Sequence, residues 1–143
     1  MSNSMTQISP IIMSLQAAQD ATAAALKKVR SFGIPYTVSI VDGAGHILLV
    51  TRMDGAAIAS IDTSIAKART SVYFGAATKD LAAAVADGQP LATIQTSTSI
   101  PLAFVAGAIP VKNSTGVVVG AVGAGGGSPQ QDHEVAAAAL TAL

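Results

Sequence analysis

Apolar residues recur at helical spacing in the first part of the chain, from about residue 10 to residue 32. Ser9 followed by Pro10 is typical of the start of a helix, where a hydroxyl caps the first turn. Gly33 and Pro35 are typical of a helix end. The pattern therefore predicts a first helix that spans this segment.

Two strands are expected next. Residues 36 to 41 alternate apolar and polar side chains, which is typical of a half-buried strand. Residues 46 to 52 form a second run of the same kind. Residues 42 to 45 (Asp-Gly-Ala-Gly) are a turn signal between them, so the two strands are predicted to form a hairpin.

The middle of the chain is predicted to be helical. Ser60 or Asp62 can cap a second helix that ends near Gly75. Its spacing places four side chains on one face, namely Ile61, Ile65, Ala68 and Val72. Thr78 can cap a short third helix, and residues 93 to 99 are expected to form a loop or a short irregular helix.

A second hairpin and a last helix complete the pattern. Residues 103 to 111 predict two short extended pieces, and residues 117 to 122 form a nearly continuous apolar strand that is covered on both faces. The glycine-rich run 123 to 127 follows, and Ser128 with Pro129 opens a helix over residues 130 to 143.

These elements define an α+β fold in the order α-β-β-α-α-β-β-α. A central antiparallel sheet of about five strands is expected, with helices packed on it. No linker or repeat divides the sequence, so residues 1 to 143 are predicted to form one domain, in which residues 1 to 8 are flexible.

Composition narrows the classes of function. The 143 residues carry eight basic and eight acidic side chains, and no basic stripe suits nucleic acid. Cys is absent, which removes disulfides and thiolate metal sites. Charged residues make up only 11%, which favours burial of part of the surface against other subunits. No membrane span or export signal stands out, and a cytoplasmic protein is expected.

The glycine run offers one candidate binding site. Gly123, Gly125, Gly126 and Gly127 precede a helix, where backbone N–H groups can hold an anion. A dinucleotide fingerprint is excluded because Ser128 stands where the pattern needs Gly or Ala. Close packing of the backbone against a helix or a neighbouring subunit explains the same glycines equally well.

Charged residues near strand ends and on the second helix offer further candidates. Arg52 can clamp a carboxylate, and Asp54 can orient Arg52 or act as a base, although the two can also form a structural ion pair. Lys67 and Thr70 share a face of the second helix. A buried Lys67 can bind an anion or act as a base. Arg69 is expected on a solvated face.

Only two histidines are present. His46 begins the second strand, and His133 lies in the first turn of the last helix beside Asp132, which is itself a candidate ligand-binding residue together with Thr70. Either imidazole can serve as an axial ligand of haem, although a structural role is expected for each. No spacing predicts a metal site.

Several motifs together resemble the GlcG/HbpS-like family. They cover almost the whole chain in the family's order, namely Val41-Asp42-Gly-Ala-Gly45-His46, Arg52-Met-Asp-Gly-Ala56, Lys67-Ala-Arg-Thr70, Gly107-Ala-Ile-Pro110, Val119-Gly-Ala-Val-Gly123 and Gln131-Asp132. Three positions depart from the family pattern. Gly125 stands in place of Ser, Ala108 in place of Gly, and His133 in place of an acid.

The resemblance implies a profilin-like fold, assembly into dimers and often octamers, and haem binding or degradation in some members. We therefore expect an oligomeric small-molecule or haem-binding protein with its pocket near subunit contacts. One alternative is a cofactor-independent enzyme for a small carboxylate or hydroxy/keto compound. In that enzyme Arg52 and the glycine run hold the anion, and Lys67, Asp54 or His46 handles a proton. A structural oligomer without chemistry is a further alternative.

Overall fold

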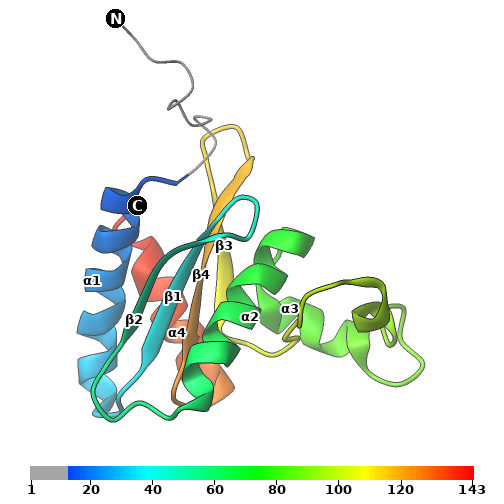
Figure 1. Ribbon diagram of the computed structural model, residues 1–143, viewed down its shortest axis with the longest axis horizontal. Coiled ribbons are helices and arrows are strands. Elements are labelled where there is room, and N and C mark those ends of the chain that lie inside the picture. The colour runs from blue at the N-terminus through cyan, green and yellow to red at the C-terminus, as the bar shows by residue number, and fades with distance from the viewer. Residues whose placement is uncertain (1–12) are drawn as a thin grey trace, which may run out of the picture.

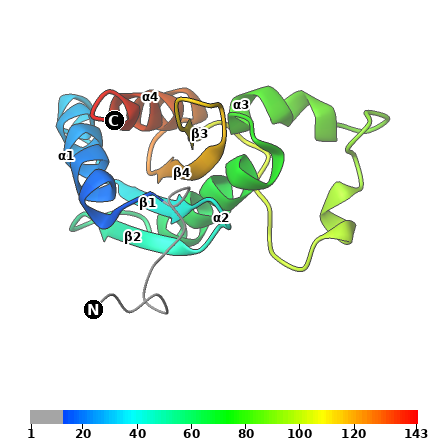
Figure 2. The same ribbon diagram turned by 90° about the horizontal axis from the view of Figure 1, so that it is seen from above.

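A four-stranded antiparallel sheet with helices on both faces forms the body of the protein (Figures 1 and 2). The structure is a computed structural model and describes residues 13 to 143. The strand order is β2-β1-β4-β3. The elements are α1 (Leu15–Phe32), β1 (Thr37–Asp42), β2 (Ile47–Arg52), α2 (Ala59–Phe74), α3 (Thr78–Leu81), the 3₁₀ helices η2 (Ala82–Val85) and η3 (Ile94–Ser97), β3 (Ala108–Lys112), β4 (Val118–Gly125) and α4 (Pro129–Leu140).

The predicted α+β class, the antiparallel sheet and the order of helices and strands are confirmed. The sheet has four strands and not about five, because residues 103 to 107 do not pair as a strand. The N–H of Ala103 donates to the Thr70 hydroxyl at 2.9 Å, which ties this segment to α2 instead of to the sheet. Residues 1 to 8, predicted to be flexible, lie outside the described residues.

Helix ends differ from the prediction where side chains form other bonds. α1 begins at Leu15, not near residue 10, and the Ser14 hydroxyl caps it by accepting from the N–H of Ala17. Ser9 and Pro10 lie outside the described residues. At the other end of the chain, the predicted Ser128 cap of α4 is confirmed as a full capping box, and this helix ends at Leu140.

Neither predicted cap of the middle helices is correct. α2 begins at Ala59 without a side-chain cap, and the Ser60 hydroxyl donates instead to the carbonyl of Ala57. Thr78 is the first residue of α3, not its cap. Its hydroxyl accepts from the N–H of Ala108 at 3.0 Å, which joins α3 to the start of β3.

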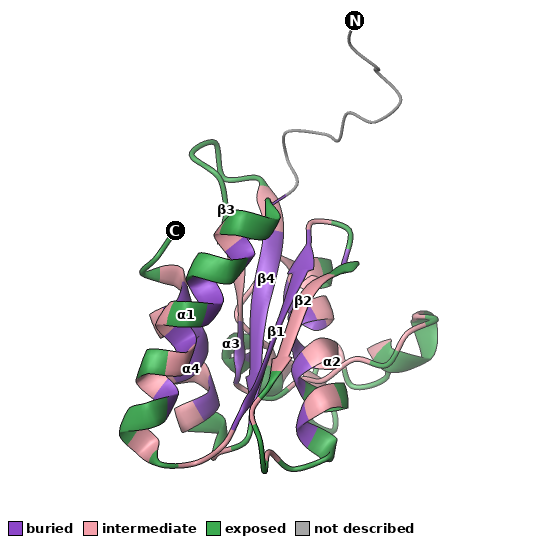
Figure 3. Cartoon of the chain, turned by 60° about the vertical axis from the view of Figure 1, so that its left-hand side comes forward, coloured by how far each residue is buried: buried purple, intermediate pink, exposed green. Residues whose placement is uncertain are grey.

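The two faces of the sheet are covered in different ways. α1 and α4 pack on one face through small side chains, and the core there includes Val38, Ile40, Val122 and Ala124. α2 covers the other face, where hydroxyl groups pair across the interface: Thr37 with Ser60 at 2.8 Å and Ser39 with Ser64 at 2.7 Å. β1 is therefore buried on both faces and not on one (Figure 3).

α2 turns its polar side toward the sheet. Its buried residues are Ser60, Ser64, Lys67, Ala68, Thr70 and Ser71. Ile61 and Ile65 are only half-buried on the other side, and Ile58, just before the helix, is 86% exposed. A helix that packs its polar side on the core leaves an apolar surface for a ligand or another subunit.

Residues 78 to 102 form an arm that extends from the body (Figures 1 and 2). It contains α3, η2 and η3, and most of its residues are exposed or half-buried. Its last residues return beside α2, where Ile100 and Pro101 help to line hollows on the outer side of that helix.

Candidate functional site

The predicted site residues fall into two groups at opposite ends of the sheet. Thr37, at the start of β1, pairs with Gly125, whereas Asp42, at the end of β1, pairs with Gly120. The glycine run is therefore at one end, and the β1–β2 turn that carries His46 is at the other. A joint role for His46 and the glycine run is not possible within one copy of the chain.

Lys67 and Asp132 form a buried ion pair at the glycine end. The Lys67 ammonium lies 2.8 Å from Asp132 Oδ2, and it also donates to the carbonyl of Ala124 at 3.1 Å. The two side chains are only 6% and 5% exposed. Side chains of a helix point back toward its N-terminus, so Lys67 can reach from the middle of α2 to this end of the sheet.

The protein's own carboxylate occupies the position predicted for an anion. Asp132 Oδ1 accepts from the N–H of Gly127 at 3.0 Å. The first turn of α4 is satisfied by its capping box, in which Ser128 and Gln131 bond each other's backbone N–H groups. The N–H groups of Gly127, Ser128 and Gln131 are thus occupied by side chains of the protein itself. Anion binding by the remaining amides of the glycine run stays a prediction.

Close packing explains much of the glycine run. A Cβ on Gly123 would collide with the Ser64 carbonyl and lie 3.0 Å from the Ala68 N, because the strand backbone touches α2 there. At Gly125 a Cβ would lie 3.1 Å from Thr63 Oγ1 and 3.3 Å from the Ser60 carbonyl oxygen. The packing interpretation of these glycines is therefore the one that the geometry favours.

A cavity of about 320 Å³ opens beside the ion pair, and we call it the Lys67 cavity. Gly126 and Gly127 line it, as do Ala57, Ala59, Ser60, Thr63, Lys67, Ala103, Val105, Gly125 and Asp132. It lies at the small end of the volumes that ligand pockets have. Its two charged groups are balanced, and the rest of its wall is made of small side chains and backbone.

Two further residues lie beside the ion pair, and neither was predicted to have a role there. Gly107 has a φ of 138°, and a Cβ there would lie 2.8 Å from Lys67 Nζ, so only glycine leaves room for the lysine. Tyr36 is fully buried, and its hydroxyl has no hydrogen-bond partner among residues 13 to 143. Burial and the neighbouring Asp132 carboxylate raise the pKa of Tyr36 well above its usual range.

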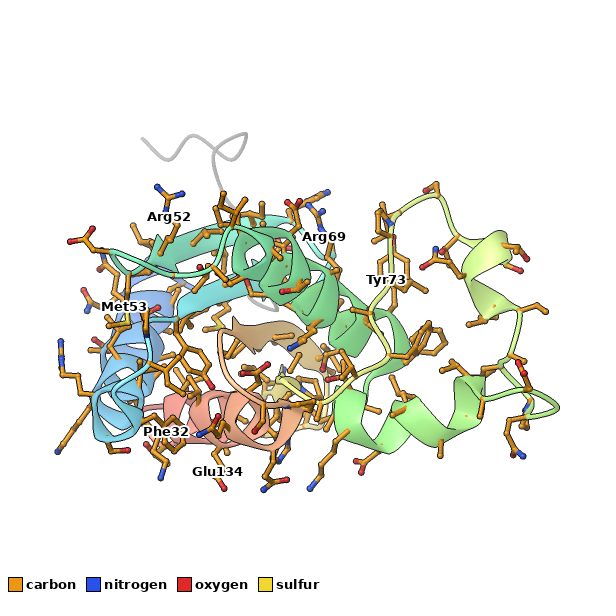
Figure 4. All side chains as sticks on the ribbon, turned by 90° about the horizontal axis from the view of Figure 1, so that it is seen from below. Phe32, Arg52, Met53, Arg69, Tyr73 and Glu134 are labelled. Carbon is orange, nitrogen blue, oxygen red and sulfur yellow. The ribbon has the colours of Figure 1, made fainter. Side chains whose placement is uncertain are left out.

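Arg52 and Asp54 are exposed, and neither lines the Lys67 cavity. Figure 4 shows Arg52 pointing away from the body at the end of β2, far from Arg69. Among the residues described, ion pairs join only Lys67 to Asp132 and His46 to Asp42, so the predicted Arg52–Asp54 pair does not form.

Thr70 is anchored in the fold. Its hydroxyl donates to the carbonyl of Ala66 and accepts from Ala103, which uses it to hold the arm. Arg52 and the glycine run lie at the same end of the sheet, but Arg52 does not line the cavity that Gly125, Gly126 and Gly127 line.

The β1–β2 turn carries the second group. Asp42 Oδ1 accepts from the N–H groups of Ala44 and His46, which fixes the turn. Its other oxygen, Oδ2, lies 3.8 Å from Nδ1 of the His46 imidazole, whose side chain is 82% exposed. At this distance the two groups are not hydrogen-bonded, and the Nε2 atom of the exposed imidazole is open to a metal ligand contact.

Arg69 connects this turn to α2. Its Nε donates to the Gly45 carbonyl at 3.0 Å, and the terminal nitrogens of the guanidinium form no further hydrogen bond within residues 13 to 143. Arg69 is half-buried and bound to the turn, so the prediction that it lies on a solvated face of the helix is only partly correct. Figure 4 shows Tyr73 on the side of α2 that faces the returning limb of the arm.

Two adjoining hollows share Arg69, and together we call them the turn groove. One has a volume of about 480 Å³ and is lined by Ile47, Asp62, Ile65, Ala66, Arg69 and Pro101. The other has about 170 Å³ and is lined by Ala44, Gly45, His46, Arg69, Tyr73 and Ile100. The groove thus combines an accessible imidazole, a guanidinium and several apolar side chains.

His133 lines neither the Lys67 cavity nor the turn groove. Its Nδ1 is buried with no hydrogen-bond partner in the described part of the chain. Burial, followed by the nearby Lys79 charge, lowers the pKa of His133 below its usual value. Within residues 13 to 143, no three His, Cys, Asp or Glu side chains converge as a metal cluster, and no helix there is long and apolar enough to cross a membrane.

Comparison with known proteins identifies the class to which this fold and these motifs belong. The family model described as "Haem degrading protein HbpS-like" matches residues 13 to 141. The chain therefore belongs to the HbpS-like family, and the resemblance found in the sequence is confirmed.

Individual relatives match almost their whole length. A 15.0 kDa protein from the dhaT–dhaS intergenic region of Citrobacter freundii is 35% identical over 96% of this chain and 95% of its own. The crystal structure of Klebsiella pneumoniae protein ORFY is 33% identical, with a TM-score of 0.87 over 99% of this chain and 96% of its own.

A third relative was solved with a ligand. The crystal structure of the PduOC:haem complex is 28% identical, with a TM-score of 0.87, and the match covers 92% of this chain and 95% of that one.

Proposed function

We propose that this protein binds haem in the turn groove, with the His46 imidazole as the axial ligand. The observation that carries the proposal is the exposed His46 imidazole at the rim of a groove whose walls are partly apolar. Histidine is a common axial ligand of haem iron. The relative whose complex with haem has been solved supports the choice of ligand.

The groove suits the rest of a haem molecule. Ile47, Ile65 and Pro101 offer apolar contacts for the faces of the macrocycle. The terminal nitrogens of Arg69 can bind a propionate carboxylate in a charge-assisted hydrogen bond. A bound haem supplies a redox-active iron, while the residues of this chain bind it, orient it and limit its contact with water.

The groove is open on its outer side, and we infer that a second copy of the chain covers it. Ile47 and Tyr73 are each 48% exposed, and both line the groove. β2, which carries Ile47, is an edge strand with one unpaired side. Self-association into dimers, and into octamers built from them, would bury these apolar groups and place the ligand near a subunit contact.

The cytoplasm remains the proposed location, since a chain without Cys needs no oxidising compartment.

Titration of haem into the purified protein tests the proposal. Wild type should give a saturable shift of the Soret band, and His46→Ala should weaken binding at least tenfold. A His133→Ala variant serves as the matched control, because it removes the other imidazole and leaves the groove intact. Equal binding by wild type and His46→Ala would refute the assignment of the axial ligand.

A further inference from the structure

The Lys67 cavity lies apart from the proposed haem groove and carries its own recognition chemistry. Lys67 and Asp132, both over nine-tenths buried, present polar atoms to an open space of about 320 Å³. Their charges cancel. A ligand with a net negative charge would face the Asp132 carboxylate, and one with a net positive charge would face the Lys67 ammonium. Lys67 and Asp132 are themselves nearly closed to solvent, so a further unpaired charge placed against either of them is unfavourable. The cavity therefore favours an uncharged molecule.

Hydrogen-bonding capacity shows what that molecule must offer. An ammonium has three N–H groups, and the structure uses two of those on Lys67, for Asp132 and Ala124. The Asp132 carboxylate accepts one bond at each oxygen, from Gly127 and Lys67, and each oxygen has a second lone pair. One donor and further acceptor sites therefore remain for a ligand.

The spacing of these groups limits the ligand further. Lys67 Nζ and Asp132 Oδ2 are only 2.8 Å apart. A ligand that contacts each of these groups with a separate oxygen must carry the two oxygens on neighbouring carbon atoms, as hydroxy-carbonyl compounds and vicinal diols do. Ala57, Ala59 and Val105 line the remaining wall and have room for a short apolar group such as a methyl.

Surrounding backbone holds this geometry in place. Gly107 leaves the space that the Lys67 side chain occupies, and Thr70 ties Ala103, another wall residue, to α2. The polar atoms are therefore fixed before any ligand binds, which lowers the entropic cost of binding.

We propose that the Lys67 cavity binds a small uncharged molecule with a hydroxyl group next to a carbonyl or a second hydroxyl. The Lys67 N–H donates to the ligand oxygen, and Asp132 accepts from its hydroxyl. This site does not depend on haem, and its ligand differs from haem in size and charge.

Lactamide and lactate form a matched pair of probes, because they have nearly the same shape and differ in charge at neutral pH. In an amide NMR titration of the full chain, lactamide should shift the signals of Gly125, Gly126 and Gly127 with saturation. Lactate should bind at least tenfold more weakly. Equal or tighter binding of lactate, or no saturable shift with lactamide, would overturn the proposal.

A variant that fills the Lys67 cavity distinguishes lactamide binding in this cavity from binding elsewhere on the chain. Ala59 is exposed in the first turn of α2 and lines the cavity, so Ala59→Leu should block lactamide binding without unfolding the chain. Ala137→Leu, at an exposed position of α4 outside the cavity, is the control and should bind as wild type does. Lactamide shifts that persist in Ala59→Leu would also overturn the proposal. Both variants should still bind haem, so failure here is distinguishable from failure of the haem assignment.

Discussion

Lys67 and Asp132 are 65 residues apart in sequence, yet their charged atoms lie 2.8 Å apart and are almost closed to solvent. This contact joins α2 to the first turn of α4 across the end of the sheet. It also pairs the ammonium group that was predicted to bind an anion or act as a base. The ion pair thus explains how a lysine can be buried at this position.

Removal of one member of this pair should destabilise the fold. In Lys67→Met the Asp132 carboxylate stays buried without its cation, and the expected loss is about 3–5 kcal/mol in the free energy of unfolding. Denaturant unfolding at pH 7 measures it. The double variant Lys67→Met/Asp132→Leu should regain part of the loss, since it leaves no unpaired charge. A single variant as stable as wild type would show that the pair is not buried in solution.

Two glycines of the run should respond differently to substitution. Gly123→Ala places a Cβ against the Ser64 carbonyl, and the free energy of unfolding is expected to fall by about 1–3 kcal/mol. Gly125→Ser restores the residue type of the family pattern at a position where the nearest atom is the Thr63 hydroxyl oxygen at 3.1 Å. Gly125→Ser should therefore lower the free energy of unfolding by less than Gly123→Ala does. Thermal unfolding of both variants checks the order, and the reverse order would contradict the packing described here.

Stability should decrease in mild acid because of His133. Burial, followed by the charge of Lys79, lowers the pKa of His133 below the ordinary value of 6.5. Between that lowered pKa and 6.5 the unfolded chain binds more protons than the folded one, so the free energy of unfolding falls as the pH drops through this window. Above it both states are neutral at this residue, and the contribution to stability is fully present.

Urea unfolding at pH 7.5 and pH 5.5 measures this effect. His133→Gln should lose less stability than wild type between the two values. His46→Gln removes the other imidazole and serves as the comparison variant. An identical loss in wild type and His133→Gln would show that His133 does not contribute.

Self-association should depend on the exposed apolar groups of the turn groove. Ile47→Lys adds a charge to the edge strand β2, and charged residues on edge strands oppose pairing with another chain. Analytical ultracentrifugation should show wild type at a multiple of the 14.2 kDa chain mass and the variant shifted toward the monomer. Val117→Lys, at another exposed apolar position (41% against 48% for Ile47), is the control. Wild type that is monomeric at all concentrations would contradict the inference.

The sequence predicted most of the fold because local signals agreed with the tertiary structure. Both hairpins and the Ser128 cap follow from turn and capping residues. Residues 103 to 107 were predicted to be extended strand, but a long-range bond to Thr70 diverts them. The inward direction of the polar side of α2 was also not predictable, since Ser60 and Ser64 find their partners on β1.

The candidate site was only partly predictable for the same reason. Lys67, Asp132 and His46 were identified as chemically notable residues, and the cavity and the groove contain them. Their partners could not be predicted, because pairing depends on distances between elements that are far apart in sequence. Gly107 lies against Lys67 and Tyr36 lies beside Asp132, and the sequence around them does not show these long-range contacts.

Haem titration followed by the Soret band tests the central claim most directly. Wild type should bind haem with saturation, and His46→Ala should bind at least tenfold more weakly, a loss of about 1.4 kcal/mol or more in binding free energy. Arg69→Gln should weaken binding by a smaller amount, about 1 kcal/mol, since it removes one charged contact. His133→Ala should match wild type. Haem binding that is unchanged in His46→Ala, or no saturable binding by wild type, would contradict the account.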